Sequence, residues 1–323
     1  MDAAVDRLMG RLGGSKVELG YEVPQGNGVA PVPAIVGVTA HEPVNEERIF
    51  QRAVEDFEAK RAKEERKQNQ VIEFGCGPIA LCFGGDEHFG GAGTDVARCF
   101  REAKIVNDTP GMYHARMGDM VNQFILGRMR AIRDGARISI PDEWVLAKML
   151  VRLMKPKLVA LVGGNHDLWA EKASGMDRLK EIMPHGPLYD KHQIEFTIRV
   201  GTAERVIKMR HKWRGHSIFN PTHGIEVTAR RDMAHFDVGV GAHTHIAGLV
   251  REFVAQRERK LAVITNTYKK YDEYGVECGF PQTDDSTCSV VVFEESGEMF
   301  GAPSMEWAAN YLKMHYQGQR LAA

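Results

Sequence analysis

The chain has 323 residues, of which 43% are apolar and 26% are charged, and its formal net charge is −1. This composition is typical of a globular protein, and the near-zero charge excludes a strong overall field that would attract nucleic acid or an anionic membrane. No stretch approaches the roughly 18 apolar residues that a membrane helix needs, and the N-terminus lacks the apolar run of a signal peptide. The apolar runs and the charge thus give no reason to expect a membrane partner. The five cysteines form no CxxC pair, so we expect reduced thiols and a cytoplasmic location.

The first 70 residues are expected to form an N-terminal extension that is mostly helical or loosely ordered. Residues 1–43 are rich in Gly, Pro, Val and Ala, which predicts a linker or a loosely packed arm. Residues 44–70 contain no Gly or Pro, and Ile49, Ala53 and Phe57 form a narrow apolar stripe at helical spacing. The stripe either packs on the body of the protein or binds a protein partner or a second copy of the chain.

From Val71 onward, apolar segments alternate with helical patterns until about residue 190. The segments "IALCFGG" and "KLVALVGG" read as strands, and "PDEWVLAKMLVRLMK" reads as a helix opened by Pro141. Such alternation predicts parallel strands with ligand sites at their carboxyl ends. Later segments such as "IEFTIRV" and "CSVVVFEE" are β-rich, so we expect one α/β sandwich domain over residues 71–312, followed by a tail at 313–323.

Polar residues follow these apolar segments wherever a strand is expected to end. In chain order they are Asp86, His88, Asp119, Asn165, His166, Asp167, His211, His243 and His245. In "HTH", both imidazoles point to the same face of an extended chain. Two divalent ions about 3.5–4 Å apart need a bridging carboxylate and further nitrogen and oxygen ligands, which this mixture of residues supplies.

The order D-x-H, G-D, G-N-H-D, H and H-x-H over residues 86–245 resembles the calcineurin-like metallophosphoesterase superfamily, including its DNA repair nuclease-like branch. The resemblance implies that family's four-layer α/β sandwich and hydrolysis of a phosphoester by a water activated between two metals. For the first metal it implies the ligands Asp86, His88 and His245, with Asp119 bridging both metals. For the second metal it implies Asn165, His211 and His243.

The resemblance also implies that His166 is not a ligand but lies beside the scissile phosphate, where Asp167 orients it and keeps it protonated. Three points in the sequence depart from a simple match. Ala242 stands directly before His243, where the family's last motif usually has glycine, and this small residue should preserve the turn. The segment "MYHARMGD" before Asp119 is less apolar than a buried central strand should be. The segment "MRHKWRGHS" offers both His211 and His216 as the fourth-motif ligand, and we favour His211 because it ends a β-like run.

Three functions remain open on the sequence alone. We favour a phosphodiesterase acting on nucleic acid such as DNA, because basic residues including Arg128 and Arg130 lie in "GRMRAIRDGARI". Trp169 and His216 are further candidates for binding the substrate. The alternatives are an enzyme acting on a nucleotide or other small phosphoester, and a non-catalytic scaffold. Mn²⁺ is the expected metal, and Fe, Zn, Co and Ni also suit these ligands.

Overall fold

The computed structural model describes residues 45–68, 70–123, 137–215, 217, 219–231, 235–246, 248–271 and 288–322 of the chain. The chain divides into two compact units, residues 1–54 and 55–323. Helix α2 (Glu46–Gln68) runs across this division, as the Gly-free and Pro-free segment predicts. Its apolar side chains Ile49 and Phe57 are 57% and 63% exposed, so the stripe predicted from the sequence faces outward.

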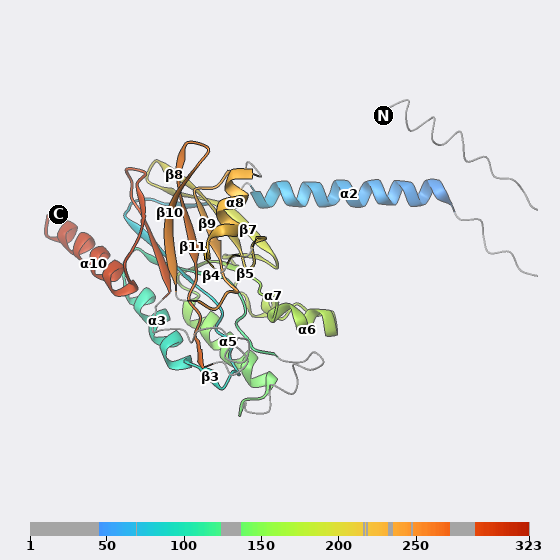
Figure 1. Ribbon diagram of the computed structural model, residues 1–323, viewed down its shortest axis with the longest axis horizontal. Coiled ribbons are helices and arrows are strands. Elements are labelled where there is room, and N and C mark those ends of the chain that lie inside the picture. Colours follow the sequence, from blue (N-terminus) through green and yellow to red (C-terminus); the bar gives the residue numbers. More distant parts are fainter. Residues whose placement is uncertain are drawn as a thin grey trace, which may run out of the picture. The chain divides into compact units, whose positions relative to one another are not determined.

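Two six-stranded sheets form the centre of the larger unit (Figure 1). The first contains, in spatial order, β1 (Gln70–Phe74), β7 (Gln193–Val200), β8 (Ala203–Arg210), β9 (Val238–Gly241), β11 (Glu258–Ile264) and β10 (Leu249–Ala255). The second contains β14 (Met299–Gly301), β13 (Ser289–Phe293), β2 (Ile79–Gly84), β4 (Met112–Arg116), β5 (Leu158–Val162) and β6 (Leu188–Asp190). A separate ribbon pairs β12 (Lys269–Tyr271) with β3 (Gly93–Thr94).

Strand directions follow the change of pattern in the sequence. Strands β2, β4, β5 and β6 are mutually parallel, as the alternation of strands and helices predicts. The first sheet is mixed: β7 and β8 pair antiparallel, whereas β8, β9 and β11 pair parallel. Because parallel strands end at the same edge, the residues after β2, β4 and β5 meet there, and so do those after β8 and β9.

The two sheets pack face to face, and helices cover their outer faces. Leu81 and Phe83 of β2 belong to the core shared with Phe196 of β7, while Ala80 and Cys82 face the opposite way. This alternation is the period of two that a strand imposes on its side chains. The outer helices are α3 (Val96–Asp108), α5 (Ile140–Met154) and α10 (Met305–Ala322) on the second sheet, and α8 (His223–Arg231) on the first.

The protein is therefore a mixed α/β sandwich, as the sequence predicts. Helix α5 begins at Ile140, with Pro141 in its first turn, behind a capping box in which the side chains of Ser139 and Asp142 accept each other's N–H groups. The tail expected at 313–323 continues α10 through Ala322, and the hydroxyl of Tyr316 donates to the carbonyl of Pro78 at 2.9 Å.

Strand β4 is central, and its two buried polar residues each have a partner. Arg116 forms an ion pair with the fully buried Glu87, and His114 Nε2 lies 3.0 Å from Asn107 Oδ1. Paired polar groups can occupy a core position that unpaired ones cannot. Within the described parts of the chain, none of the helices combines the length and apolar character that crossing a membrane requires.

Candidate metal centre

The polar residues predicted to lie together do so at the carboxyl ends of strands from both sheets. Asp86 and His88 follow β2, Asp119 follows β4, Asn165 follows β5, His211 follows β8, and His243 and His245 follow β9. The short helix α6 (Asp167–Ser174) begins directly after Asn165 and His166, and a second short helix, α7 (Arg178–Ile182), follows it. Two edges formed by different sheets thus supply one cluster.

The cluster contains three groups of residues, and within each group the ligand atoms all lie within 4.8 Å of one another. They are Asp86 with His88 and His245, Asp119 with His211 and His243, and His88 with Asp119 and His166. In the first group, the Nε2 atoms of His88 and His245 are 2.8 Å apart. Asp119 Oδ2 lies 3.1 Å from His211 Nε2 and 3.9 Å from His88 Nε2. Asp119 therefore connects the two sets of residues, which is the position a bridging carboxylate requires.

Buried oxygens without donors indicate that the cluster fits a cation. Among the described residues, Asp86 Oδ1 and Asn165 Oδ1 are inaccessible to solvent and accept no hydrogen bond. Asp119 Oδ2 also accepts no hydrogen bond of normal geometry, and its neighbours are imidazole nitrogens. Burying such oxygens without a partner is costly, whereas a divalent ion would satisfy them. Mixed nitrogen and oxygen donors suit Mn, Fe, Co, Ni or Zn.

The backbone at the cluster is held in a conformation that side chains disfavour. Eight described residues other than glycine have a positive φ, and five of them are Asp86, His88, Asp119, His243 and His245. The left-handed region costs a non-glycine residue free energy, so such residues persist only where surrounding contacts impose them, and they concentrate at functional sites. The sharp turns bring both sets of ligands inward over a short length of chain.

Burial and electrostatic interactions within the cluster shift the pKa values of its histidines in opposite directions. Burial lowers the pKa of His211, but the carboxylates of Asp119 and Asp86 outweigh it and raise the pKa to about 10. Burial and the charge on His211 lower the pKa of His243 to about 4, and burial and His245 hold the pKa of His88 well below its usual value. A proton on His211 thus balances Asp119 in the metal-free protein, and a metal bound there would have to displace it.

Asp167 accepts hydrogen bonds from the backbone rather than from His166. Its Oδ2 accepts from the N–H groups of Asp119 at 2.7 Å and Gly164 at 3.0 Å, and its Oδ1 accepts from Met120 at 3.0 Å. The prediction that Asp167 orients His166 is wrong, because both carboxylate oxygens face these donors. Asp167 instead ties the turn after β4 to the turn after β5.

The partner of His166 is the carbonyl oxygen of Asn122, 2.6 Å from Nδ1. Burial lowers the pKa of His166 more than Asp119 and Asn122 raise it, a direction opposite to the one that would keep the imidazole protonated. We assign its proton to Nδ1 from this contact. The other nitrogen, Nε2, faces the cluster 4.0 Å from Asp119 Oδ2, close enough to belong to the group with His88.

Several supporting residues carry no recognisable signal in the sequence. Gln123 has a φ of 41°, its N–H donates to Glu143, and its side chain joins the indole N–H of Trp144 to the carbonyl of His166. The first turns of α5 thereby hold the loop that carries Asn122. These contacts join residues from separate elements, so no local pattern indicates them.

Replacing Gly164 with alanine is expected to destabilise the fold by about 2–4 kcal/mol. A Cβ at this position would lie 2.2 Å from the backbone nitrogen of Asp119 and equally close to its carboxylate, so the two turns would have to separate. Urea unfolding of the metal-free protein measures the change. Gly75→Ala is the matched control, because a Cβ there meets nothing within 4 Å. Equal stability of the two variants would contradict the expectation.

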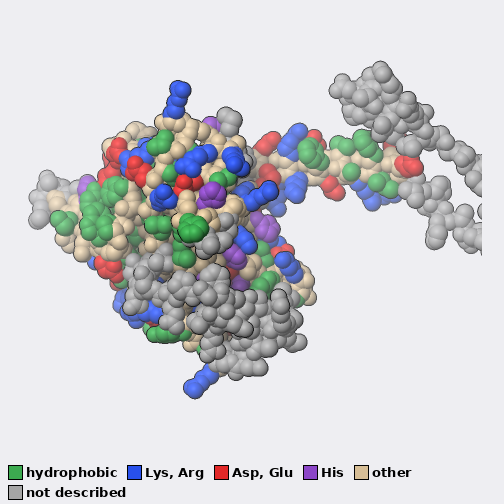
Figure 2. Space-filling model, in the orientation of Figure 1, with side chains coloured by type: hydrophobic (Ala, Val, Ile, Leu, Met, Phe, Trp, Pro, Cys, Tyr) green, Lys and Arg blue, Asp and Glu red, His purple; other side chains and the backbone are tan. Residues whose placement is uncertain are grey.

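The residues predicted to bind substrate are only partly described. The ring of Trp169 lies 4.1 Å from that of His166, centroid to centroid, and Trp169 is half-buried. Arg128, Arg130 and His216 lie outside the described residues. On the face drawn in Figure 2, Lys and Arg side chains are interspersed with Asp and Glu, and histidine side chains reach the surface.

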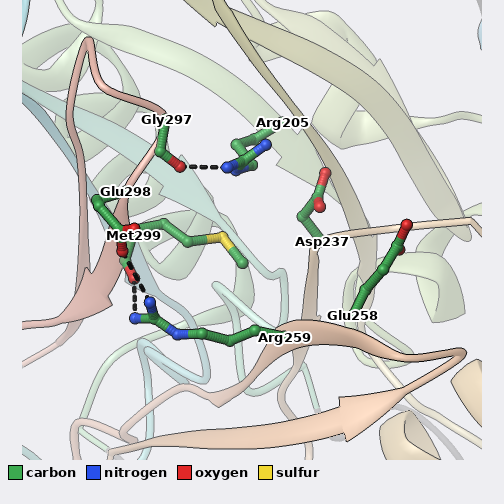
Figure 3. A pocket seen from close by; sticks show the side chains of 7 residues that line it. All are labelled: Arg205, Asp237, Glu258, Arg259, Gly297, Glu298 and Met299. Atoms are coloured by element: carbon green, nitrogen blue, oxygen red, sulfur yellow. Dashed lines mark hydrogen bonds and ion pairs between the residues drawn. The ribbon is translucent and has the colours of Figure 1, made fainter.

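A separate charged pocket lies at the opposite ends of the same strands (Figure 3). It is lined by Arg205, Asp237, Glu258, Arg259, Gly297, Glu298 and Met299. Arg205 is near the start of β8 and Asp237 precedes β9, whereas His211 and His243 follow the carboxyl ends of these strands. Because it lies at the other ends of these strands, this pocket is no part of the cluster, and within it Arg259 pairs with Glu298 at 2.8 Å.

No protein-family model matches the chain, and no curated protein matches it significantly. The class of site therefore rests on the residues themselves: buried groups of Asp and His, at the carboxyl ends of strands in an α/β sandwich, that could hold a metal ion.

Proposed function

We propose that this protein is a metal-dependent phosphoesterase of the calcineurin-like type, which hydrolyses its substrate directly with water. The observation that carries the proposal is the cluster around Asp119, where two sets of buried Asp and His side chains share one carboxylate. The sequence order of these residues and the two-sheet sandwich agree with that superfamily. We assign Asp86, His88 and His245 to one ion, Asn165, His211 and His243 to the other, and Asp119 to both.

Two divalent ions bound there would lower the pKa of a water molecule and offset the negative charge that develops on phosphoryl oxygens. The protein residues provide the geometry for this chemistry. Asp167 fixes the backbone at Asp119 by accepting a hydrogen bond from the Asp119 N–H, and the carbonyl of Asn122 fixes the ring of His166. The side chain of His166 is 13% exposed and its Nε2 faces the cluster. We infer that this nitrogen contacts the phosphoryl group or exchanges a proton with the leaving oxygen.

Saturating Mn²⁺ is expected to raise the midpoint of thermal unfolding by about 5 °C, because ions that bind only the folded protein stabilise it. The effect should disappear on adding EDTA, and differential scanning calorimetry of the metal-free and Mn²⁺-loaded protein measures it. The absence of any shift with Mn²⁺, Zn²⁺, Co²⁺ or Ni²⁺ would contradict a dinuclear site.

A phosphodiester in nucleic acid is the substrate class that we favour. The chain between Asp167 and His211 forms α6, α7 and strands β6, β7 and β8, which belong to the sandwich rather than to a separate cap. Because this segment does not form a cap over the site, it leaves room for a polymer such as DNA to approach. Trp169 beside His166 is suited to stacking on a base. A nucleotide or another small phosphoester is the alternative substrate, and a scaffold without activity is the alternative of another class.

The deciding experiment is Mn²⁺-dependent hydrolysis of linear single-stranded and double-stranded DNA, compared with bis-p-nitrophenyl and p-nitrophenyl phosphate. The His166→Ala variant serves as the control for contaminating enzymes. Degradation of DNA by the wild type alone would support the nuclease, and cleavage of only the small esters would favour the second substrate class. Two bound ions without any hydrolysis would support the scaffold.

A further inference from the structure

The loop between β8 and α8 begins at the metal centre and carries basic side chains on its solvent side. His211, a proposed metal ligand, is 5% exposed, and the next residue, Lys212, is exposed. Trp213 is half-buried, its indole N–H donates to the carbonyl of Val240 at 2.7 Å, and Arg214 is again exposed. The anchored indole therefore fixes this part of the loop with Lys212 and Arg214 in solvent.

The positive charge of this surface is not offset by nearby carboxylates. Among the described residues, neither Lys212 nor Arg214 forms an ion pair. The carboxylate of Glu226, on α8, is only 4% exposed and is already shared by Arg230 at 3.1 Å and Arg251 at 3.7 Å. Two arginines beside one carboxylate leave a surplus of positive charge, which adds to that of the loop.

The loop and helix α8 form one continuous surface. A Cβ on Gly224, in the first turn of α8, would lie 2.7 Å from the carbonyl oxygen of Arg214 and 2.9 Å from the Cβ of Trp213. Arg251 of β10 donates to the side-chain oxygen of Asn220, just before α8, at 3.1 Å. The basic residues of the loop, the helix and the strand therefore border the same region.

The turn before α8 presents an aromatic ring to solvent within this basic region. Phe219 is 95% exposed. Its neighbour Asn220 is held on both sides, because its N–H donates to the Ser217 hydroxyl at 3.3 Å and its Oδ1 accepts from the Thr222 N–H at 3.1 Å. A ring held in water in this way forgoes the free energy of burial, which a flat apolar partner would supply.

We propose that this surface binds a single strand of nucleic acid that leads to the metal centre; this rests on the function proposed above. Phe219 stacks on an unpaired base, and Lys212 and Arg214 contact phosphates of the backbone. Exposed rings among basic side chains are the usual means of binding single strands, because every base has a flat face and every nucleotide a phosphate. A duplex keeps its bases stacked on one another and offers Phe219 no such face.

Phe219→Ala tests the stacking contact. Fluorescence anisotropy of a labelled oligo(dT), with the metal-free protein in EDTA so that no strand is cut, should show binding weakened about 10-fold. Phe219→Trp should restore the affinity, because its larger ring also stacks on a base. Phe57→Ala is the matched control, since it removes another exposed ring, 63% accessible, on α2.

The double variant Lys212→Gln/Arg214→Gln tests the backbone contacts. The slope of the logarithm of affinity against the logarithm of salt concentration should become shallower by about 1.4, from roughly 0.7 for each lost phosphate contact on a single strand. Phe219→Ala should leave that slope unchanged, because a stacked ring releases no counterions. Lys148→Gln/Arg152→Gln, which removes two exposed charges of α5, is the control.

Unchanged affinity in Phe219→Ala, or an unchanged salt dependence in the double variant, would overturn this inference and leave the phosphoesterase standing. A wild-type protein that does not bind oligo(dT) would overturn it as well, while hydrolysis of the small esters would still support the enzyme. The expected losses of affinity, together with no hydrolysis of any ester by the wild type, would support the nucleic-acid surface and overturn the phosphoesterase.

Discussion

Replacing Asp119 with asparagine is expected to lower phosphoester hydrolysis by about 10³-fold or more and to reduce the number of bound Mn²⁺ ions. Asp119 Oδ2 lies 3.1 Å from His211 and 3.9 Å from His88, so one charged oxygen serves both sets of ligands. Asparagine preserves the shape but removes the charge that offsets two cations. Its Oδ1 can still accept the N–H bond of His166, which Asp119 accepts at 2.7 Å.

Because that backbone contact survives, the variant should keep its fold and lose its metals. Activity, bound metal per chain and the thermal midpoint separate these effects. Asp56→Asn, on the exposed face of α2, is the control for removing one carboxylate elsewhere. A variant at Asp119 that retains two ions and near-normal turnover would exclude its role as the bridge.

Replacing His166 with alanine is expected to lower kcat by about 10²- to 10⁴-fold while leaving two bound metals. The reason is its position: Nδ1 is held by the Asn122 carbonyl, and Nε2 points toward the cluster without belonging to either proposed ligand set. His192→Ala is the matched control, because His192 is exposed on the turn before β7.

Metal content decides between two interpretations of the same loss in activity. The ligand atoms of His166, His88 and Asp119 lie within 4.8 Å of one another, so distance alone would also allow His166 to be a ligand. Loss of one ion together with activity would make His166 a ligand. Full metal content and full activity would remove it from the mechanism.

Much of the fold could be predicted from the sequence, because the spacing of apolar residues along a strand or a helix is visible within a short stretch of chain. The runs at β2 and β5 are apolar and short, and α5 carries both its proline and its capping box. The polar strand β4 was harder to predict, since its burial depends on the Arg116–Glu87 pair, and Glu87 lies on a different element. The end of α10 was missed because Tyr316 finds its partner, Pro78, far away in the chain.

The residue types at the ends of the strands can be recognised from the sequence, because a motif such as "GGNHD" places its polar side chains through local geometry. Parallel strands then bring those side chains to one edge, as the cluster around Asp119 shows. The hydrogen-bond partners of those side chains depend instead on how distant segments pack together. Asp167 binds backbone N–H groups, which every residue possesses and no motif distinguishes. The ribbon that pairs Lys269 with Thr94 likewise joins segments far apart in the chain, so no local signal indicates it.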